Sequence, residues 1–307
     1  MRAVITGATG AIGMALIQEL MERNAEVLVI CREGSGRNER IPEVPGVKKM
    51  ELNMDAYQKY EPESVDYDVF FHMAWSGTTG ASRNDTAMQQ ANVEYAKDSV
   101  VLAHKLGCKA YVGVGSQAEY GRVEGKLCAD TPTNPETEYG KAKLMAGNAT
   151  RQLCERYGMK HIWTRVLSVY GPYDTEHSMI VSSARKVLTG EIPTFTKGEQ
   201  QWDYLYSKDA AKALIALATK GLHNNVYPLG SGKVRPLSEY IEILRDTINP
   251  DAEIDLGAVP YGEKQVMYLC ADVSKLKQDT GFEPRISFEE GMKETVCWLV
   301  QEGDNHV

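Results

Sequence analysis

The segment Ala3–Gly13, AVITGATGAIG, decides the fold of this chain. It begins with a short apolar run typical of a buried strand, and a helical apolar pattern follows over Ala11–Arg23. Between them, Gly7, Gly10 and Gly13 stand three residues apart. Glycines at a strand-to-helix turn permit the tight bend, the approach of a ligand to the backbone and close packing of the helix. The start of such a helix attracts phosphate, so the segment predicts a dinucleotide-binding turn.

Short apolar runs and helical patterns alternate through the first half of the chain. We expect strands at Ala3–Thr6, Glu26–Cys31, Val47–Leu52, Val69–Met73, Ala110–Gly115 and His161–Val166, and helices at Ala11–Arg23, Asn92–Leu106 and Tyr139–Tyr157. This alternation is typical of an α/β protein with a Rossmann-type, doubly wound parallel sheet. Ligands of such sheets bind beyond the carboxyl ends of the strands.

The regular alternation of expected strands and helices ends after Tyr170-Gly171-Pro172. The later elements that we expect are helices at Met179–Thr189, Asp209–Thr219, Leu237–Ile248 and Phe288–Val300, and a strand at Val226–Leu229. We predict a dinucleotide-binding domain from residues 1–169 and about 204–230. Residues of about 170–203 and 231–307 would form a smaller C-terminal α/β domain that binds the substrate.

Composition excludes several classes of partner. The 307 residues carry a formal net charge of −8, which argues against nucleic acid and anionic membranes as partners. The six cysteines form no close pair of the kind that a metal site needs, so we expect no metal. The chain begins with a strand in place of an export signal and lacks a long apolar run, so we expect it in the cytoplasm.

The end of the second expected strand bears on the choice of cofactor. An acidic residue there would bind the ribose 2′-hydroxyl of NAD, but this chain has Arg32, followed by Ser35, Arg37 and Arg40. A guanidinium suits the 2′-phosphate of NADP by charge and by its forked geometry. The residues favour NADP over NAD, and a solvated basic loop is the alternative interpretation.

Tyr139 and Lys143 are four residues apart on an expected helix, so their side chains share one face. A free tyrosine has a pKa of about 10, and a neighbouring ammonium lowers it, which suits a proton donor or acceptor during hydride transfer. Ser116 follows a buried strand, where its hydroxyl could bond the substrate oxygen. The pair alone is common by chance, and a surface helix pair is its alternative reading.

Together with further segments, these motifs resemble the extended short-chain dehydrogenase/reductases, the NAD(P)-dependent sugar-nucleotide epimerase/dehydratase/reductase family. The resemblance covers nearly the whole chain. The segments that carry it are the glycine turn, His72-Met73-Ala74, Asn92-Val93, Ser116–Gly121 (SQAEYG), Tyr139 with Lys143, Arg165–Pro172 (RVLSVYGP), Asp203–Asp209 and Val226–Gly230.

The resemblance implies that Tyr139 is the general acid and base, that Lys143 activates it and anchors the nicotinamide ribose, and that Ser116 binds the substrate oxygen. His72 is expected to pack near the cofactor. Asn92 is either a cofactor-side residue or a helix cap. The cofactor contacts that we expect are Gly7, Thr9, Gly10, Ala11, Ile12, Gly13, Arg32, Met73, Ala74, Asn92, Tyr139, Lys143 and Val166. The substrate contacts that we expect are Trp75, Ser116, Gln117, Tyr139, Ser168, Trp202, Arg235 and Tyr268.

Departures from the family pattern narrow the reaction. Family dehydratases carry Asp-Glu directly after the Ser or Thr, where this chain has Gln117 and Ala118, so 4,6-dehydration loses its acid and base. Two family arginines that clamp the diphosphate correspond here to Trp202 and Tyr268. These aromatics either stack on a base or sugar or simply pack the domain cleft.

Three functions remain open. The first is NADPH-dependent reduction of a 4-keto group on a nucleoside-diphosphate sugar, the second is NAD-dependent epimerisation of such a sugar, and the third is a non-catalytic dinucleotide sensor. A sensor has no need of Ser116, Tyr139 and Lys143, so we rank it below the enzymes. The resemblance also implies a homodimer through the helices expected at Asn92–Leu106 and Tyr139–Tyr157.

Overall fold

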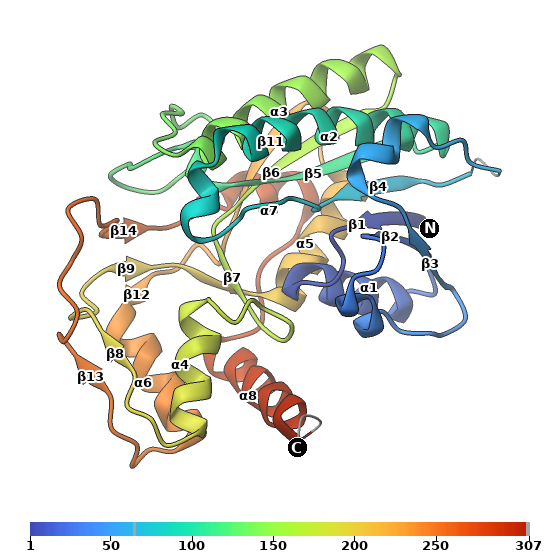
Figure 1. Ribbon diagram of the computed structural model, residues 1–307. Helices are drawn as coiled ribbons and strands as arrows, with labels where there is room; N and C mark the ends of the chain where they lie inside the picture. The colour runs from blue at the N-terminus through green and yellow to red at the C-terminus, as the bar shows by residue number, and fades with distance from the viewer. Residues whose placement is uncertain (64–65, 305–307) are drawn as a thin grey trace.

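A seven-stranded parallel sheet forms the centre of the computed structural model, which describes residues 1–63 and 66–304 (Figure 1). Its strands are β1 (Arg2–Thr6), β2 (Glu26–Cys31), β3 (Val47–Glu51), β4 (Val69–His72), β5 (Ala110–Ser116), β6 (Lys160–Val166) and β11 (Asn225–Leu229). Their order across the sheet is β11-β6-β5-β4-β1-β2-β3, and every neighbouring pair is parallel. The predicted doubly wound α/β fold is therefore confirmed.

Helices cover both faces of this sheet (Figure 1). Helices α1 (Ala11–Glu22) and α5 (Ser207–Lys220) pack together on one face, and α2 (Thr86–Lys105) and α3 (Glu138–Arg156) pack together on the other. Each face has its own apolar core, one around Ile5 and Leu16 and the other around Phe70 and Tyr111. Because the central strands are buried on both sides, their sequences are continuous apolar runs, which is why they could be predicted.

Helix α2 begins earlier than the sequence pattern indicated. We expected a helix from Asn92, but α2 starts at Thr86, and the Asp85 carboxylate accepts the backbone N–H of Met88 at 3.0 Å as its N-cap. The first turn of α2 has two apolar residues, Ala87 and Met88, but neither is buried, so it shows no apolar period that faces a core. The alternative that Asn92 caps a helix is therefore wrong, because it lies in the second turn.

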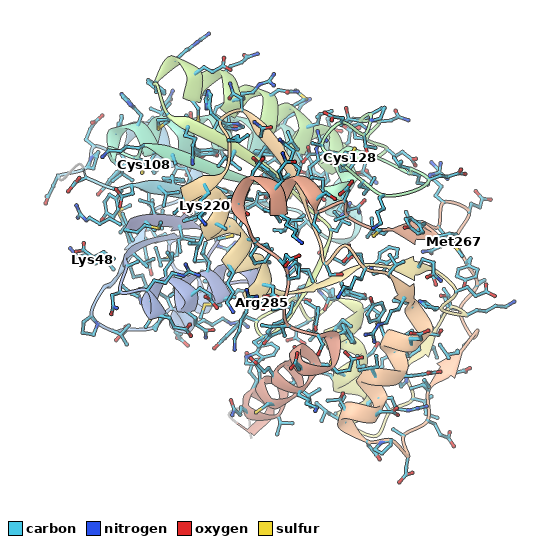
Figure 2. The ribbon with its side chains drawn as sticks, turned by 180° about the vertical axis from the view of Figure 1, so that it is seen from behind. Lys48, Cys108, Cys128, Lys220, Met267 and Arg285 are labelled. Carbon is cyan, nitrogen blue, oxygen red and sulfur yellow. The ribbon has the colours of Figure 1, made fainter. Side chains whose placement is uncertain are left out.

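The C-terminal part forms a smaller body beside the sheet (Figure 1). Helices α4 (Met179–Leu188), α6 (Leu237–Ile248) and α8 (Phe288–Asp304) enclose a third apolar core. The short elements around them are β7 (Ser168–Tyr170) paired with β10 (Tyr204–Tyr206), the three-stranded sheet β12 (Arg235–Pro236), β9 (Gln201–Trp202) and β14 (Tyr268–Leu269), and the pair β8 (Thr194–Phe195) and β13 (Asp255–Leu256). Helix α7 (Ser274–Thr280) packs instead against α5 and β11 of the large sheet. Figure 2 shows Met267 on this smaller body and Lys48 and Cys108 on the side of the large sheet.

Asp203 ties three segments of the chain together at the junction of β9 and β10. Its buried carboxylate accepts the backbone N–H groups of Ser231, Gly232 and Ala271, at 2.6 to 3.0 Å, and the Ser231 hydroxyl at 2.6 Å. Four donors on one carboxylate satisfy a charge that would otherwise be costly to bury.

Within the described chain, no helix has the length and apolar character needed to cross a bilayer.

Candidate active site

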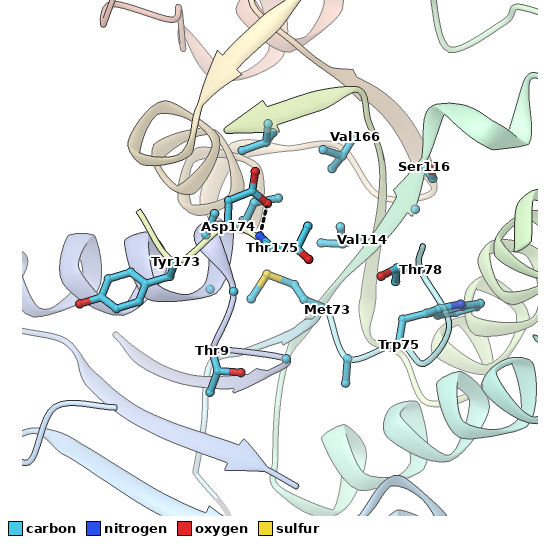
Figure 3. Close-up of a pocket in the computed structure, with 18 of the residues that line it drawn as sticks. Thr9, Met73, Trp75, Thr78, Val114, Ser116, Val166, Tyr173, Asp174 and Thr175 are labelled. Atoms are coloured by element: carbon cyan, nitrogen blue, oxygen red, sulfur yellow. Dashed lines mark hydrogen bonds between the residues drawn. The ribbon is translucent and has the colours of Figure 1, made fainter. Parts of the chain in front are cut away.

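A cavity of about 450 Å³ opens beyond the carboxyl ends of the central strands (Figure 3). Thirteen of the residues that we proposed as contacts line it together: Gly7, Thr9, Gly10, Ala11, Ile12, Gly13, Met73, Ala74, Trp75, Ser116, Tyr139, Lys143 and Val166. Residues separated by more than 150 positions in the chain thus meet at one edge of the sheet. The switch from β1 to β4 in the strand order creates the crevice where ligands of such folds bind.

Each glycine of the first turn has a distinct structural reason. Gly7 has φ +71°, and a Cβ there would lie 2.5 Å from the Ala74 nitrogen. A Cβ on Gly13 would lie 2.5 Å from the Ala8 Cα and carbonyl oxygen. A Cβ on Gly10 would meet no described atom within 4 Å, so this backbone faces open space. With helix α1 starting at Ala11 and no side chain capping it, free N–H groups face that space, and a pyrophosphate fits there.

A second pocket, of about 370 Å³, adjoins the glycine turn at the end of β2. Arg32, Ser35 and Arg37 line it, and Arg37 also lines the main cavity. Arg40 lines the main cavity and donates to the carbonyl oxygen of Thr9 at 3.3 Å. Several guanidinium groups therefore surround the place where the adenosine end of a dinucleotide would lie.

Tyr139 stands at the start of α3, where the Thr137 hydroxyl caps the helix by accepting the Gly140 N–H at 3.1 Å. The side chain of Ser116, the last residue of β5, lies beside this phenol and favours its ionised form. The side chain is 8 % exposed, and burial raises the pKa of the phenol above its usual 10. The phenol is therefore neutral, and the lowering of its pKa that we expected from Lys143 is not found, because burial outweighs the charges around it.

Lys143 is held one helical turn later, as the spacing predicts. Its Nζ donates to the Val114 carbonyl oxygen at 2.7 Å and lies 3.8 Å from the centre of the Trp75 ring. The distance from Nζ to the Tyr139 ring centre is 5.9 Å. The side chain is 4 % exposed, and burial lowers the pKa of Lys143 to about 7, although the nearby Glu119 carboxylate acts to raise it.

Beneath this group lies a buried ion pair that sequence reasoning missed. Glu119, in the short helix η4 (Gln117–Glu119), accepts the Ser116 backbone N–H at 2.9 Å and the Arg165 Nε at 2.8 Å. It also accepts the Trp163 indole N–H at 3.1 Å. Glu119 is fully buried and Arg165 is 6 % exposed. The pair fixes the end of β5 that presents Ser116 to the cavity.

The loop after β4 closes the cavity on the side of Tyr139. Trp75 packs edge-on against the Tyr139 ring, with centroids 6.2 Å apart, and donates its indole N–H to Gln89 at 2.9 Å. Asn92, which we expected as a cofactor contact, does not line the cavity. It binds both the N–H and the C=O of Ser76, at 3.0 and 2.9 Å, and so fixes this loop.

His72 lies in β4 behind the cavity rather than on its surface. Its Nδ1 is 2.9 Å from the Thr6 hydroxyl, and its ring stacks on Tyr111. Burial lowers the pKa of His72 to about 3, so the ring is neutral. A packing position of this kind is the one that we expected for it.

A segment that the sequence did not single out covers the far side of the cavity (Figure 3). Tyr173, Asp174, Thr175 and Glu176 line it directly after the Tyr-Gly-Pro turn, where Tyr173 takes a positive φ of 66°. The Asp174 carboxylate accepts the Thr175 N–H at 2.7 Å, and burial raises the pKa of Asp174 to about 6.

The other predicted contacts lie outside the lining of the main cavity. The expected cofactor contact Arg32 lines the adjoining pocket, and the expected substrate contacts that do not line the cavity are Gln117, Ser168, Trp202, Arg235 and Tyr268. Trp202 donates its indole N–H to the Ser168 hydroxyl at 2.9 Å. The residues on either side of Ser168 in the chain, Leu167 and Val169, do line the cavity. Register pairs Trp202 with Arg235 and Leu269, but pairs Tyr268 with Gln201. Tyr268 and Trp202 therefore lie on opposite faces of the small sheet and cannot stack on the same ring.

Arg235, another of these residues, already forms an ion pair, because its Nη1 donates to Glu289 at 2.6 Å.

Over residues 1–63 and 66–304, no three His, Cys, Asp or Glu side chains gather as a metal site would need.

Comparison with known proteins agrees with this geometry. The model of the NAD dependent epimerase/dehydratase family matches residues 3–230. A dTDP-glucose 4,6-dehydratase of Xanthomonas campestris pv. campestris is 27% identical over 203 residues, which are 62% of this chain and 57% of that protein. A putative UDP-glucose 4-epimerase of Methanocaldococcus jannaschii is 26% identical over 96% of this chain and 97% of its own length. The solved structure of a UDP-N-acetylglucosamine 4-epimerase from Methanobrevibacter ruminantium, in complex with UDP-N-acetylmuramic acid, superposes with a TM-score of 0.88 at 24% identity, covering 98% of each chain.

Proposed function

This chain belongs to the NAD-dependent epimerase/dehydratase family, the extended short-chain dehydrogenase/reductases, and on that premise we propose that it reduces a nucleoside-diphosphate 4-keto sugar with NADPH. One observation carries the proposal: Ser116, Tyr139 and Lys143 line the same cavity as the glycine turn. A proton donor, a hydroxyl and a cation therefore surround the place that a nicotinamide reaches when its pyrophosphate lies on helix α1.

When bound, the nicotinamide cofactor would supply a hydride for the carbonyl carbon of the sugar. Ser116 would donate a hydrogen bond to the carbonyl oxygen and hold it beside the Tyr139 phenol. Tyr139 would give its proton to that oxygen, and Lys143 would stabilise the phenolate that remains. The neutral phenol that burial favours is the form that proton donation requires.

The preference for NADP rests on the pocket at the end of β2. Arg32, Ser35 and Arg37 line this pocket, and a 2′-phosphate would meet two guanidinium groups there. NAD offers these cations only a neutral hydroxyl. We therefore propose that NADP(H) binds more tightly than NAD(H).

The sugar and its nucleotide are proposed to lie toward the smaller body, on the side of Ser168 and Trp202. The curated relatives carry the names of enzymes for dTDP- and UDP-sugars, which supports this class of substrate. Trp202 would offer an aromatic face where the family has an arginine, and its indole N–H already orients Ser168 beside the cavity. Gln117 and Ala118 replace the acid and base of the dehydratases, so 4,6-dehydration is not proposed.

Epimerisation with tightly held NAD is the second candidate, because two of the relatives described above are named as 4-epimerases. Both candidates use Ser116, Tyr139 and Lys143, so the residues themselves do not separate them. The behaviour of the cofactor does, because an epimerase regenerates it in each cycle and a reductase consumes it.

The test combines ligand analysis with a turnover assay. Mass spectrometry identifies the nucleotide that copurifies with the protein, and NADPH oxidation is followed with dTDP-, CDP- and UDP-linked 4-keto-6-deoxy sugars. A reductase is expected to oxidise one NADPH per sugar reduced. Retained NAD with interconversion of two sugar epimers, and no consumption of NADPH, would instead establish the epimerase. Binding without any turnover would contradict both and leave the dinucleotide sensor.

We also propose a homodimer through the outer faces of α2 and α3, where Met145 is 56% exposed. Light scattering after size exclusion tests this, because a 34.1 kDa species at micromolar concentration would contradict it.

A further inference from the structure

An arginine outside the family motifs lies directly on the proposed catalytic tyrosine. Arg83 belongs to the short helix η3 (Gly80–Asn84), and its guanidinium carbon is 4.4 Å from the centre of the Tyr139 ring. Its Nη1 donates to the Thr78 carbonyl oxygen at 3.2 Å, and Thr78 lines the main cavity. A cation over an aromatic face is attracted by the ring, and more strongly once the phenol loses its proton.

The loop that carries Arg83 is fixed from within the fold. Gln89 is 1 % exposed, and its Nε2 donates to the carbonyl oxygens of Gly77 at 2.8 Å and Ser82 at 3.0 Å. Asp85, two residues after Arg83, caps α2. Arg83 is therefore held at the ring by defined contacts on both sides of it in the chain.

The other groups that face Tyr139 do not supply a constant positive charge. Ser116 is a neutral partner, Trp75 presents a ring edge, and the Glu119 carboxylate opposes ionisation of the phenol. Lys143 is a cation at 5.9 Å, but burial lowers its pKa to about 7, so it carries only part of a charge near neutral pH. A guanidinium keeps its proton throughout this range.

We propose that Arg83 is a positioning residue that stabilises the Tyr139 phenolate with a permanent positive charge, independently of the protonation state of Lys143. The inference rests on the proposed role of Tyr139 and adds a second cation to it. Arg83 acts through Tyr139, and its guanidinium carbon lies closer to the centre of the Tyr139 ring, at 4.4 Å, than Lys143 Nζ does, at 5.9 Å.

The test is a direct titration of Tyr139 in the protein without added substrate. The protein is labelled with [ζ-13C]tyrosine, and the Tyr139 resonance is the one missing from Tyr139→Phe. At pH 10, Arg83→Gln is expected to lower the ratio of ionised to neutral Tyr139 about tenfold, since an opposite charge at this range moves a pKa by about one or more. Arg83→Lys is expected to recover part of the ratio, because it keeps the charge but not the planar group.

Lys141→Gln is the matched control, because Lys141 is an exposed cation of the same helix, paired with Glu138 at 2.7 Å. It is expected to leave the ratio within twofold of the parent protein. A ratio in Arg83→Gln within twofold of the parent, or an equal fall in Lys141→Gln, overturns the proposal. Arg83→Met repeats the test if the Gln variant does not fold. Because no turnover is measured, a wrong assignment of substrate or reaction would not alter this result.

Discussion

Replacing Lys143 with methionine tests whether the fold bears a measurable cost for burying this amine. Methionine keeps the length of the side chain and removes its titration. The folded protein lowers the pKa of Lys143 from 10.5 to about 7 through burial, whereas the unfolded chain retains the ordinary value. Between these two values the unfolded state binds more protons than the folded state, so the free energy of unfolding rises with pH. The contribution of Lys143 to this free energy is therefore least favourable below pH 7.

The magnitude follows from the number of protons that Lys143 binds in each state. At pH 7 the folded amine is about half protonated and the unfolded amine almost fully, and by pH 9 the difference approaches one proton. At about 1.36 kcal/mol per pH unit for each proton, the parent protein gains about 2 kcal/mol relative to Lys143→Met between pH 7 and pH 9.

Urea unfolding of the nucleotide-free proteins at pH 7, 8 and 9 measures this gain as the difference between the two free energies of unfolding. Lys141→Met serves as the control, because Lys141 is exposed and its replacement should leave that difference constant with pH. The reasoning would be refuted if the difference between the free energies of unfolding of the parent protein and Lys143→Met changed by less than about 0.5 kcal/mol from pH 7 to pH 9.

Three further predictions concern residues around the same cavity. Glu119→Gln leaves the buried Arg165 guanidinium without its counter-charge and should cost about 3–5 kcal/mol in urea unfolding; a loss below about 1 kcal/mol would contradict the role given to this pair. Gly13→Ala should lower the melting temperature, because its Cβ would meet the Ala8 backbone at 2.5 Å, whereas Gly10→Ala should melt like the parent yet bind NADP(H) more weakly; equal melting of the two would count against the proposed turn geometry. Affinity for NADP(H) should fall as pH rises through about 6, because Asp174 in the cavity becomes negative, and Asp174→Asn should remove this step in a fluorescence titration; an unchanged step would assign it elsewhere.

The central sheet and the catalytic helix could be predicted from the sequence because each has a local cause. Strands such as β5 are mostly buried, and β5 has no charged residue and is apolar up to Gly115. In the glycine turn, a Cβ at Gly7 or Gly13 would clash with neighbouring backbone. Tyr139 and Lys143 share a face because of the helical repeat.

The features that sequence reasoning missed depend on contacts between distant segments. Glu119 and Arg165 are 46 positions apart, and Arg83 contacts Tyr139 from a distant loop that hydrogen bonds from Gln89 fix. The first turn of α2 buries neither of its two apolar residues, and the strands of the small sheet are two residues long, so neither shows a hydrophobic period. The opposite facing of Trp202 and Tyr268 is a matter of register, which two-residue strands do not encode.

The central claim is that Tyr139 exchanges the proton while the rest of the cavity binds the cofactor, and Tyr139→Phe tests it most directly. The variant is measured by NADPH fluorescence titration and by turnover of the sugar nucleotide that the parent protein uses. We predict a dissociation constant for NADPH within about twofold of the parent and turnover at least ~100-fold lower, the loss typical of a missing acid or base. Turnover within about tenfold of the parent, with binding intact, would contradict the account.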